Sequence, residues 1–129
     1  MLALLISLFL SSGAATAVPP RAVRILAAGD TLEIENDWVR VWRSKRAPHE
    51  KTPMAEHLAH VVVYLTDAHQ RMTGADGRAQ DITQKAGAVA YRGGARYAEE
   101  NVSDAPLEAI IVELKPGAPR SPRIRAGPS

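Results

Sequence analysis

Residues 48–65 read PHEKTPMAEHLAHVVVYL and end in VVVYL at residues 61–65, the strongest strand signal of the chain. β-Branched and aromatic side chains favour extended backbone, and an apolar run this short is typical of a buried strand. A strand that lines a core needs only one apolar face, whereas this run is apolar on both. The stretch therefore predicts a core strand whose second face also has a cover.

The same kind of short strand recurs on both sides of this stretch, separated by sequences that favour turns. Turn residues stand at 36–37 (Asn-Asp) and 104–106 (Asp-Ala-Pro), and GADG at residues 74–77 offers glycine where a hairpin loop needs positive φ. No stretch repeats apolar residues with the period of a long amphipathic helix. We expect strands at residues 31–35, 38–44, 61–65, 71–73, 78–83, 88–92 and 107–114. Short strands at this spacing predict an all-β domain, either a sandwich or a barrel.

Size, charge and cysteine content narrow the classes of protein. A chain of 129 residues makes one domain, and such a domain buries a core large enough to fold without disulfides. The chain contains no cysteine, which excludes thiol catalysis and thiolate metal sites. The net charge is +2, and the basic excess gathers near the C-terminus at Arg120, Arg123 and Arg125. Acidic residues are spread over the rest of the chain, so we expect no nucleic-acid partner.

The N-terminus has the features of an export signal. Residues 1–10, MLALLISLFL, form an apolar core too short to cross a bilayer, and Ala-Thr-Ala at residues 15–17 offers small residues to a signal peptidase. We predict cleavage after Ala17, a mature chain that begins at Val18, a periplasmic or secreted location, and no membrane contact after cleavage. A buried N-terminal strand or a retained anchor is the alternative. The expected organisation is a signal peptide (1–17), an extended lead-in (18–30), a β-barrel (31–115) and a disordered Pro/Arg tail (116–129).

Two segments of the barrel region, residues 48–65 and 87–114, together resemble the two sequence motifs of the cupin superfamily. The phrases KTPM at residues 51–54 and VVVYLTD at residues 61–67, with one hairpin between the motifs, are similar to those of its small single-domain members. The resemblance covers residues 32–115. It implies a double-stranded β-helix, a jelly-roll barrel whose interior often holds a divalent metal.

The positions that hold the metal ligands in that family are mostly substituted in this chain. The motif spacing places Ala55 and His57 where the family has two histidines, and Val61 where it has a glutamate. Counting back from Asn101, which matches the closing asparagine of the second motif, places Tyr97 at the third histidine. The resemblance therefore implies a ligand pocket lined by Ala55, His57, Val61 and Tyr97, in which only His57 keeps a usual ligand.

The donor chemistry at these positions argues against tight metal binding. A zinc site needs at least three protein ligands, and a tyrosine coordinates only after losing a proton whose pKa is ordinarily about 10. His60 lies next to the glutamate position, and alternation along a strand aims it away from His57 unless a bulge intervenes. We expect no tightly bound cofactor. Binding of a divalent metal remains an alternative, with His57 as the first candidate ligand and His60 and Tyr97 as weaker ones.

The sequence is compatible with two functions. The first is an exported, non-catalytic barrel that binds a small molecule or serves as an assembly module, which the loss of three ligand positions favours. The second is a metal-dependent enzyme of the oxygenase or isomerase type, with a reduced ligand set of His57 and one of His60, Tyr97 or Glu100. Fold alone does not fix function, so neither the substrate nor the presence of catalysis follows from the sequence.

The apolar strand also predicts a homodimer. Alternation assigns its side chains to two faces, Val61, Val63 and Leu65 to the interior and Val62 and Tyr64 to the outside. The outer pair needs a cover, which a second copy of the chain provides. The lead-in at residues 18–30 is the alternative cover within one chain.

Overall fold

The computed structural model describes residues 27–117, and this part of the chain contains strands only. The strands are β1 (Asp30–Glu35), β2 (Val39–Arg46), β3 (Ala55–His57), β4 (His60–Tyr64), β5 (Ala68–Gly74), β6 (Ala79–Gln84), β7 (Val89–Arg92), β8 (Ala95–Asn101) and β9 (Leu107–Leu114). Within the described range there is accordingly no helix long and apolar enough to cross a membrane. The predicted signal peptide, most of the lead-in and the tail beyond residue 117 lie outside the described residues.

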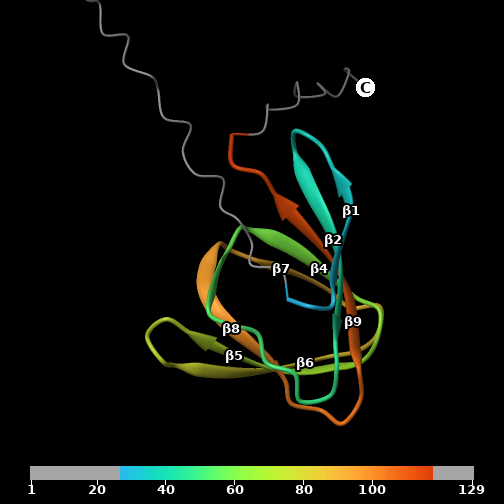
Figure 1. The fold of residues 1–129 in the computed structure, drawn as a ribbon, viewed down its shortest axis with the longest axis vertical. Coiled ribbons are helices and arrows are strands. Elements are labelled where there is room, and N and C mark those ends of the chain that lie inside the picture. Colours follow the sequence, from blue (N-terminus) through green and yellow to red (C-terminus); the bar gives the residue numbers. More distant parts are fainter. Residues whose placement is uncertain (1–26, 118–129) are drawn as a thin grey trace, which may run out of the picture.

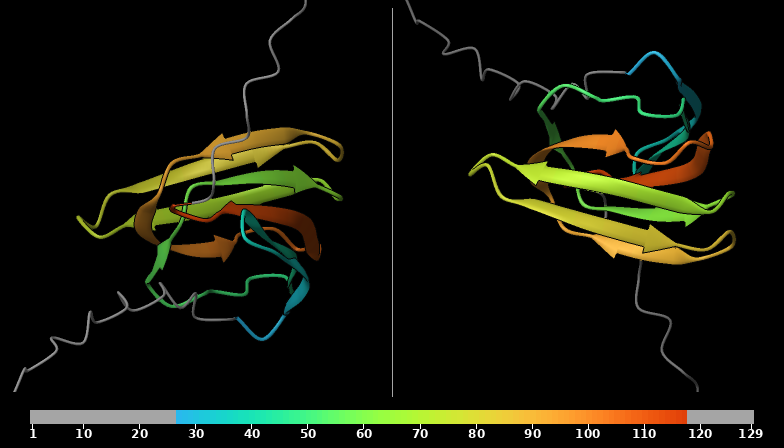
Figure 2. Two further views of the ribbon diagram at one scale, coloured as in Figure 1. Left: turned by 90° about the horizontal axis from the view of Figure 1, so that it is seen from above. Right: turned by 90° about the horizontal axis from the view of Figure 1, so that it is seen from below.

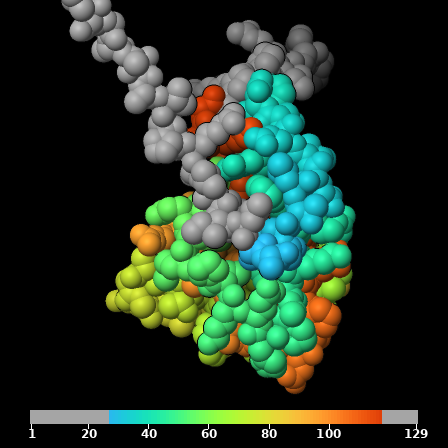
Figure 3. All heavy atoms as spheres, viewed as in Figure 1, coloured from blue at the N-terminus to red at the C-terminus, as the bar shows by residue number. Residues whose placement is uncertain are grey.

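The strands form two antiparallel sheets that enclose the core. The larger sheet has the order β1-β2-β9-β4-β7, and the smaller has the order β3-β8-β5-β6. Figure 1 shows β2 and β9 side by side along one flank of the molecule, with the β5–β6 hairpin at the other side. Figure 2 shows from two further directions how the strands curl around a common interior. In the space-filling view the β1–β2 hairpin forms one long edge (Figure 3). The all-β prediction is confirmed.

Most predicted strands are present close to their expected limits. The strand expected at residues 107–114 coincides with β9, and those expected at residues 31–35 and 38–44 correspond to β1 and β2 with small shifts at their ends. Strands β3 and β8 had no counterpart among the expected strands. β3 is only three residues long, and β8 reads ARYAEEN without an apolar alternation. The two pair with each other, with Ala55 opposite Tyr97, so tertiary pairing rather than local propensity defines them.

The loop at residues 74–77 closes the β5–β6 hairpin, as the sequence predicts. The backbone N–H of Gly74 donates to the carbonyl of Arg78 at 2.9 Å, and the N–H of Gly77 donates to the carbonyl of Gly74 at 3.0 Å. Gly77 has a φ of 80°, a left-handed conformation that only glycine adopts at little cost.

The core lies where the inward side chains of the two sheets meet. Its buried apolar cluster consists of Val62, Tyr64, Ala68, Leu107 and Ala109. Trp42 in β2 and Ile111 in β9 lie directly opposite each other on the same inner face, and both are buried. Tyr64 is only 1% exposed, and the hollow left beside it measures about 10 Å³.

The predicted face assignment of the VVVYL run is wrong. The buried residues of β4 are its alternate positions His60, Val62 and Tyr64. Val61 and Val63 lie on the outer face and are half-buried, and Leu65 beyond the strand is 43% exposed. Alternation holds along β4 itself, but β3 and β4 belong to different sheets. Because the chain passes between sheets at residues 58–59, alternation counted from β3 does not reach His60.

Candidate functional site

A row of polar and charged side chains crosses the inner face of the larger sheet. The register places Arg40 opposite Glu113, Glu113 opposite His60, and His60 opposite Arg92. Glu113 is 2% exposed and forms an ion pair with Arg40, whose Nε lies 3.1 Å from the carboxylate Oε2. His60 is 3% exposed. Polar groups buried this deeply require partners, and this row makes one end of the interior polar.

Tyr97 of β8 lies at the centre of a cluster with His57 and His60. The rings of His57 and Tyr97 are stacked, with centroids 3.8 Å apart and planes 5° apart. The Tyr97 hydroxyl oxygen lies 3.4 Å from His60 Nε2, and the centroids of the two imidazoles are 6.3 Å apart. Ala55 lies directly opposite Tyr97 in β3, and its small side chain leaves room for the tyrosine ring on the face that the two residues share. The structure thus brings together three of the residues that the sequence singles out.

Hydrogen-bond partners define where the protons lie in this cluster. His60 Nδ1 is 2.7 Å from the carbonyl oxygen of Leu58, and because a carbonyl only accepts, Nδ1 carries a hydrogen. In the neutral ring His60 Nε2 is then an acceptor, and the Tyr97 hydroxyl donates to it. His57 Nε2 donates to the backbone carbonyl of Tyr97 at 3.3 Å. The three side chains are therefore linked by stacking and hydrogen bonds.

The described residues do not fit a metal centre. Within residues 27–117 no group of three or more His, Cys, Asp or Glu side chains is placed to hold an ion. Ligation by histidine needs a nitrogen lone pair. His60 Nδ1 and His57 Nε2 donate to backbone carbonyls, so each neutral ring keeps one nitrogen lone pair, and the Tyr97 hydroxyl hydrogen-bonds the one on His60. The two histidines of this cluster therefore supply two nitrogen donors, fewer than the three protein ligands of a zinc site.

The other candidate positions do not join this cluster. Val61 lies on the outer face of β4, opposite to the inward placement that its motif position implies. Glu100 belongs to the other face of β8 from Tyr97, and it lies 3.9 Å from the Lys51 ammonium. Ala55 and His57 line a hollow of about 10 Å³. Such a space holds one water molecule at most and excludes an organic ligand.

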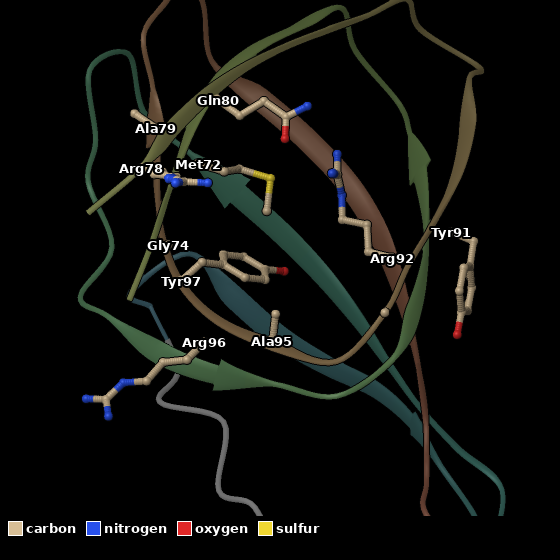
Figure 4. Close-up of a pocket in the computed structure, with 11 residues that line it drawn as sticks. Met72, Gly74, Arg78, Ala79, Gln80, Tyr91, Arg92, Ala95, Arg96 and Tyr97 are labelled. Atoms are coloured by element: carbon tan, nitrogen blue, oxygen red, sulfur yellow. The ribbon is translucent and has the colours of Figure 1, made fainter. Parts of the chain in front are cut away.

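A much larger cavity, of about 460 Å³ and widely open to solvent, lies beside Tyr97 between the β5–β6 hairpin and the segment that joins β7 to β8. Figure 4 shows Met72, Gln80, Arg92 and Tyr97 directed into this cavity, whereas Arg96 is turned away from it. Its size is typical of sites for small organic molecules, which span roughly 300–1,000 Å³. The cavity and the cluster share the side chain of Tyr97.

Arg92 is the guanidinium that enters the cavity. Its Nη2 donates to the Tyr64 hydroxyl at 2.8 Å, which attaches it to the buried core. Of the carboxylates in residues 27–117, none forms an ion pair with Arg92, and no Asp or Glu lines the cavity. The side chain is half-buried and retains N–H donors beyond the one that Tyr64 accepts.

The sequence does not single out three of these cavity residues, Met72, Gln80 and Arg92. Arg92 ends a short strand, and Met72 and Gln80 belong to a hairpin that is mostly exposed. The one available signal is the alternation in VAYR at residues 89–92, where the first and third side chains are exposed and the second and fourth point inward. That pattern places an arginine inside a barrel, which composition alone gives no reason to expect.

The fold matches solved structures of cupin domains. A cupin domain from Bordetella pertussis Tohama I superimposes with a TM-score of 0.62 at 23% identity, over 74% of this chain and 97% of that chain. An RmlC-like cupin family protein with a double-stranded β-helix fold from Methanocaldococcus jannaschii gives 0.54 at 13% identity, over 74% and 84%. A cupin superfamily protein from Desulfitobacterium hafniense DCB-2 gives 0.53 at 15% identity, over 67% and 76%.

Neither a protein-family model nor a curated protein matches the chain. The likeness to solved structures nevertheless establishes the architecture. The chain has the fold of a small cupin domain, a double-stranded β-helix, as its sequence resemblance implied.

Proposed function

We propose that this small cupin-fold domain is an exported barrel that binds a small organic molecule in the cavity beside Tyr97. The observation that carries the proposal is the cavity itself, whose volume of about 460 Å³ suits such a ligand. Gln80 and Arg92 contribute polar groups to it, and Met72 and the Tyr97 ring contribute apolar surface. Export is supported by the sequence of residues 1–17.

The alternative function, a metal-dependent enzyme, has weaker support from the same residues. Its ligand set would have to combine His57 with His60, Tyr97 or Glu100. His57 and His60 supply two nitrogen donors, the Tyr97 hydroxyl beside them hydrogen-bonds His60, and Glu100 belongs to the other face of β8. For a binding function these residues need only give the cavity a rigid wall, and the Tyr97 ring that lines the cavity is stacked on His57.

Filling the cavity tests the binding proposal. Ala95 lines the cavity and is exposed, so the Ala95→Trp variant should occupy the ligand volume without disturbing the core. We expect fragments from a mixed library of charged and neutral compounds to shift NMR amide signals around Met72, Gln80, Arg92 and Tyr97 in the parent, and to lose these effects in Ala95→Trp.

The matched control is Ala86→Trp, which adds the same side chain at an exposed loop position outside the cavity. It should bind the same fragments as the parent. Fragments that bind Ala95→Trp as well as the parent, or that shift only signals distant from the cavity, would contradict the proposal.

A further inference from the structure

The cavity beside Tyr97 carries positive charge without a carboxylate in its lining. The lining includes Arg78, Arg92 and Arg96 and no Asp or Glu. Arg96 points away from the cavity in Figure 4, and the highly exposed Arg78 lies 3.7 Å from the Asp76 carboxylate. Of the three, Arg92 is the arginine that Figure 4 shows directed into the cavity, and Glu99 lines a separate small hollow behind it. A concave site with an excess of positive charge attracts anions and repels divalent cations.

Arg92 is positioned by a neutral partner. The Tyr64 hydroxyl accepts one of its hydrogen bonds at 2.8 Å, and Tyr64 is itself immobilised in the core at 1% exposure. A hydroxyl orients the guanidinium without neutralising its charge, and none of the carboxylates that the structure describes forms an ion pair with it. A guanidinium carries five N–H donors in a planar fork that matches a carboxylate in a bidentate arrangement. Arg92 is thus ready for an anionic ligand.

The remaining groups that point into the cavity suit an uncharged ligand body. Met72 and the ring of Tyr97 offer polarisable apolar surface, and Gln80 offers a neutral amide (Figure 4). The Tyr97 hydroxyl donates a hydrogen bond to His60, so towards the cavity its oxygen acts as an acceptor. One inward guanidinium balances one negative charge, and a second charge on the ligand would stay uncompensated in a partly buried site.

We propose that the ligand of this cavity is a small organic monocarboxylate, with its carboxylate on Arg92 and its apolar body against Met72 and Tyr97. The inference rests on the proposed binding function and names its ligand class. The proposal requires Arg92 to favour a negatively charged ligand over a neutral one of the same shape, and not merely to add contact area.

A matched pair of probes, 2-naphthoate and 2-naphthamide, tests this directly because the two have nearly the same shape and differ in charge. In calorimetric titrations of the full chain, we expect naphthoate to bind at least about tenfold more tightly than naphthamide. Arg92→Gln should weaken naphthoate binding by at least about tenfold. Arg96→Gln removes the same charge from the lining, but this side chain points away, so the affinity should change by less than about threefold.

Arg92 also bonds Tyr64, so the NMR spectrum of Arg92→Gln must show a native fold before its affinity is interpreted. If this variant fails to fold, the naphthoate affinity of Arg92→Lys is measured instead, because lysine keeps the positive charge and lacks the planar guanidinium fork. A clear loss of naphthoate affinity in Arg92→Lys supports the assignment, and an unchanged affinity overturns it.

Equal binding of both probes, unaffected by Arg92→Gln, would overturn the carboxylate assignment and leave the cavity as a ligand site. Failure of the proposed function gives a different result, in which neither probe nor any library fragment shifts the cavity signals and Ala95→Trp changes nothing.

Discussion

At the residue scale, Tyr97 links the side chains of the polar cluster in the interior. Tyr97 stacks on His57 and donates to His60, and Ala55 opposite it leaves room for the ring. The sequence, through its resemblance to a family, identified Ala55, His57 and Tyr97 as neighbours. It missed Arg92, whose importance depends on a hydrogen bond to Tyr64, 28 positions away in the chain.

The same residues predict how a metal site could be restored. The double substitution Ala55→His with Tyr97→His places imidazoles at two opposite positions of β3 and β8, next to His57. With three histidines the ligand count reaches that of a zinc site. Overpacking at Ala55 should cost about 1–3 kcal/mol of folding free energy, which a domain of ordinary stability tolerates. Calorimetric titration with Zn²⁺ should show at most weak binding to the parent and clearly tighter binding to the variant.

The control for this experiment is Ala55→His with Glu100→His, which adds the same two imidazoles but places one on the other face of β8. It should bind zinc no better than the parent. Stoichiometric metal in the purified parent that is lost in His57→Ala would contradict the prediction and favour the metal enzyme. Loss in His60→Ala would have the same meaning and would identify His60 as the ligand.

At the element scale, the strands were predictable where their own side chains alternate, and less so where pairing defines them. β9 and β2 carry clear apolar patterns and lie where the sequence indicates. β3 and β8 lack an apolar alternation, and their pairing defines them, because β8 lies between β3 and β5 in the smaller sheet. The passage between sheets at residues 58–59 leaves no signal in composition, and this is why the inner and outer faces of β4 were exchanged. Local patterns thus predict strands better than they predict which sheet a strand joins.

The β5–β6 hairpin carries a pH-dependent contact of its own. Arg71 donates two hydrogen bonds to Asp81, Nε to Oδ1 at 2.8 Å and Nη2 to Oδ2 at 3.3 Å. These hydrogen bonds, and then the charge of Arg71, lower the pKa of Asp81 from its ordinary value of 3.8. Because the folded-state pKa is lowered, the contact stabilises the hairpin at pH values above the ordinary pKa. This stabilisation is lost as the pH falls through the folded-state pKa. Both side chains are solvent-exposed, so the effect should be small.

We therefore expect Asp81→Asn to lower the unfolding temperature slightly near neutral pH and to converge with the parent in strong acid. Thermal unfolding followed by circular dichroism over a series of pH values measures both effects. Asp37→Asn is the control, since Asp37 is exposed and forms no ion pair with any residue that the structure describes. A constant difference between Asp81→Asn and the parent at every pH would contradict the assigned role of this carboxylate.

At the scale of the whole molecule, the outer face of the larger sheet is apolar across several strands. The register aligns Val41, Val112, Val61 and Tyr91 in one row, and Ile110, Val63 and Val89 in a second. Val89 and Tyr91 are 65% and 66% exposed, although the central valines are half-buried. The charges beside the rows are paired, because Arg43 bonds both Glu33 and Glu108. A second copy can therefore approach this face without opposing like charges.

We therefore still predict a homodimer, with a contact through Val61 and Val63. Val62 and Tyr64, which the sequence assigned to this contact, are buried in the core. A symmetric pair would bury the same patch on both copies, as two-fold dimers do.

Light scattering should give the mass of a dimer at about tens of micromolar, a concentration at which an interface of ordinary size is populated. Val89→Glu, on the exposed edge of the patch, should shift the protein towards the monomer because a charge would be desolvated in the contact. Thr83→Glu, exposed on β6 of the other sheet, should leave the mass unchanged. A monomer in all three proteins would contradict the dimer and make the lead-in at residues 18–30 the better candidate for covering this face.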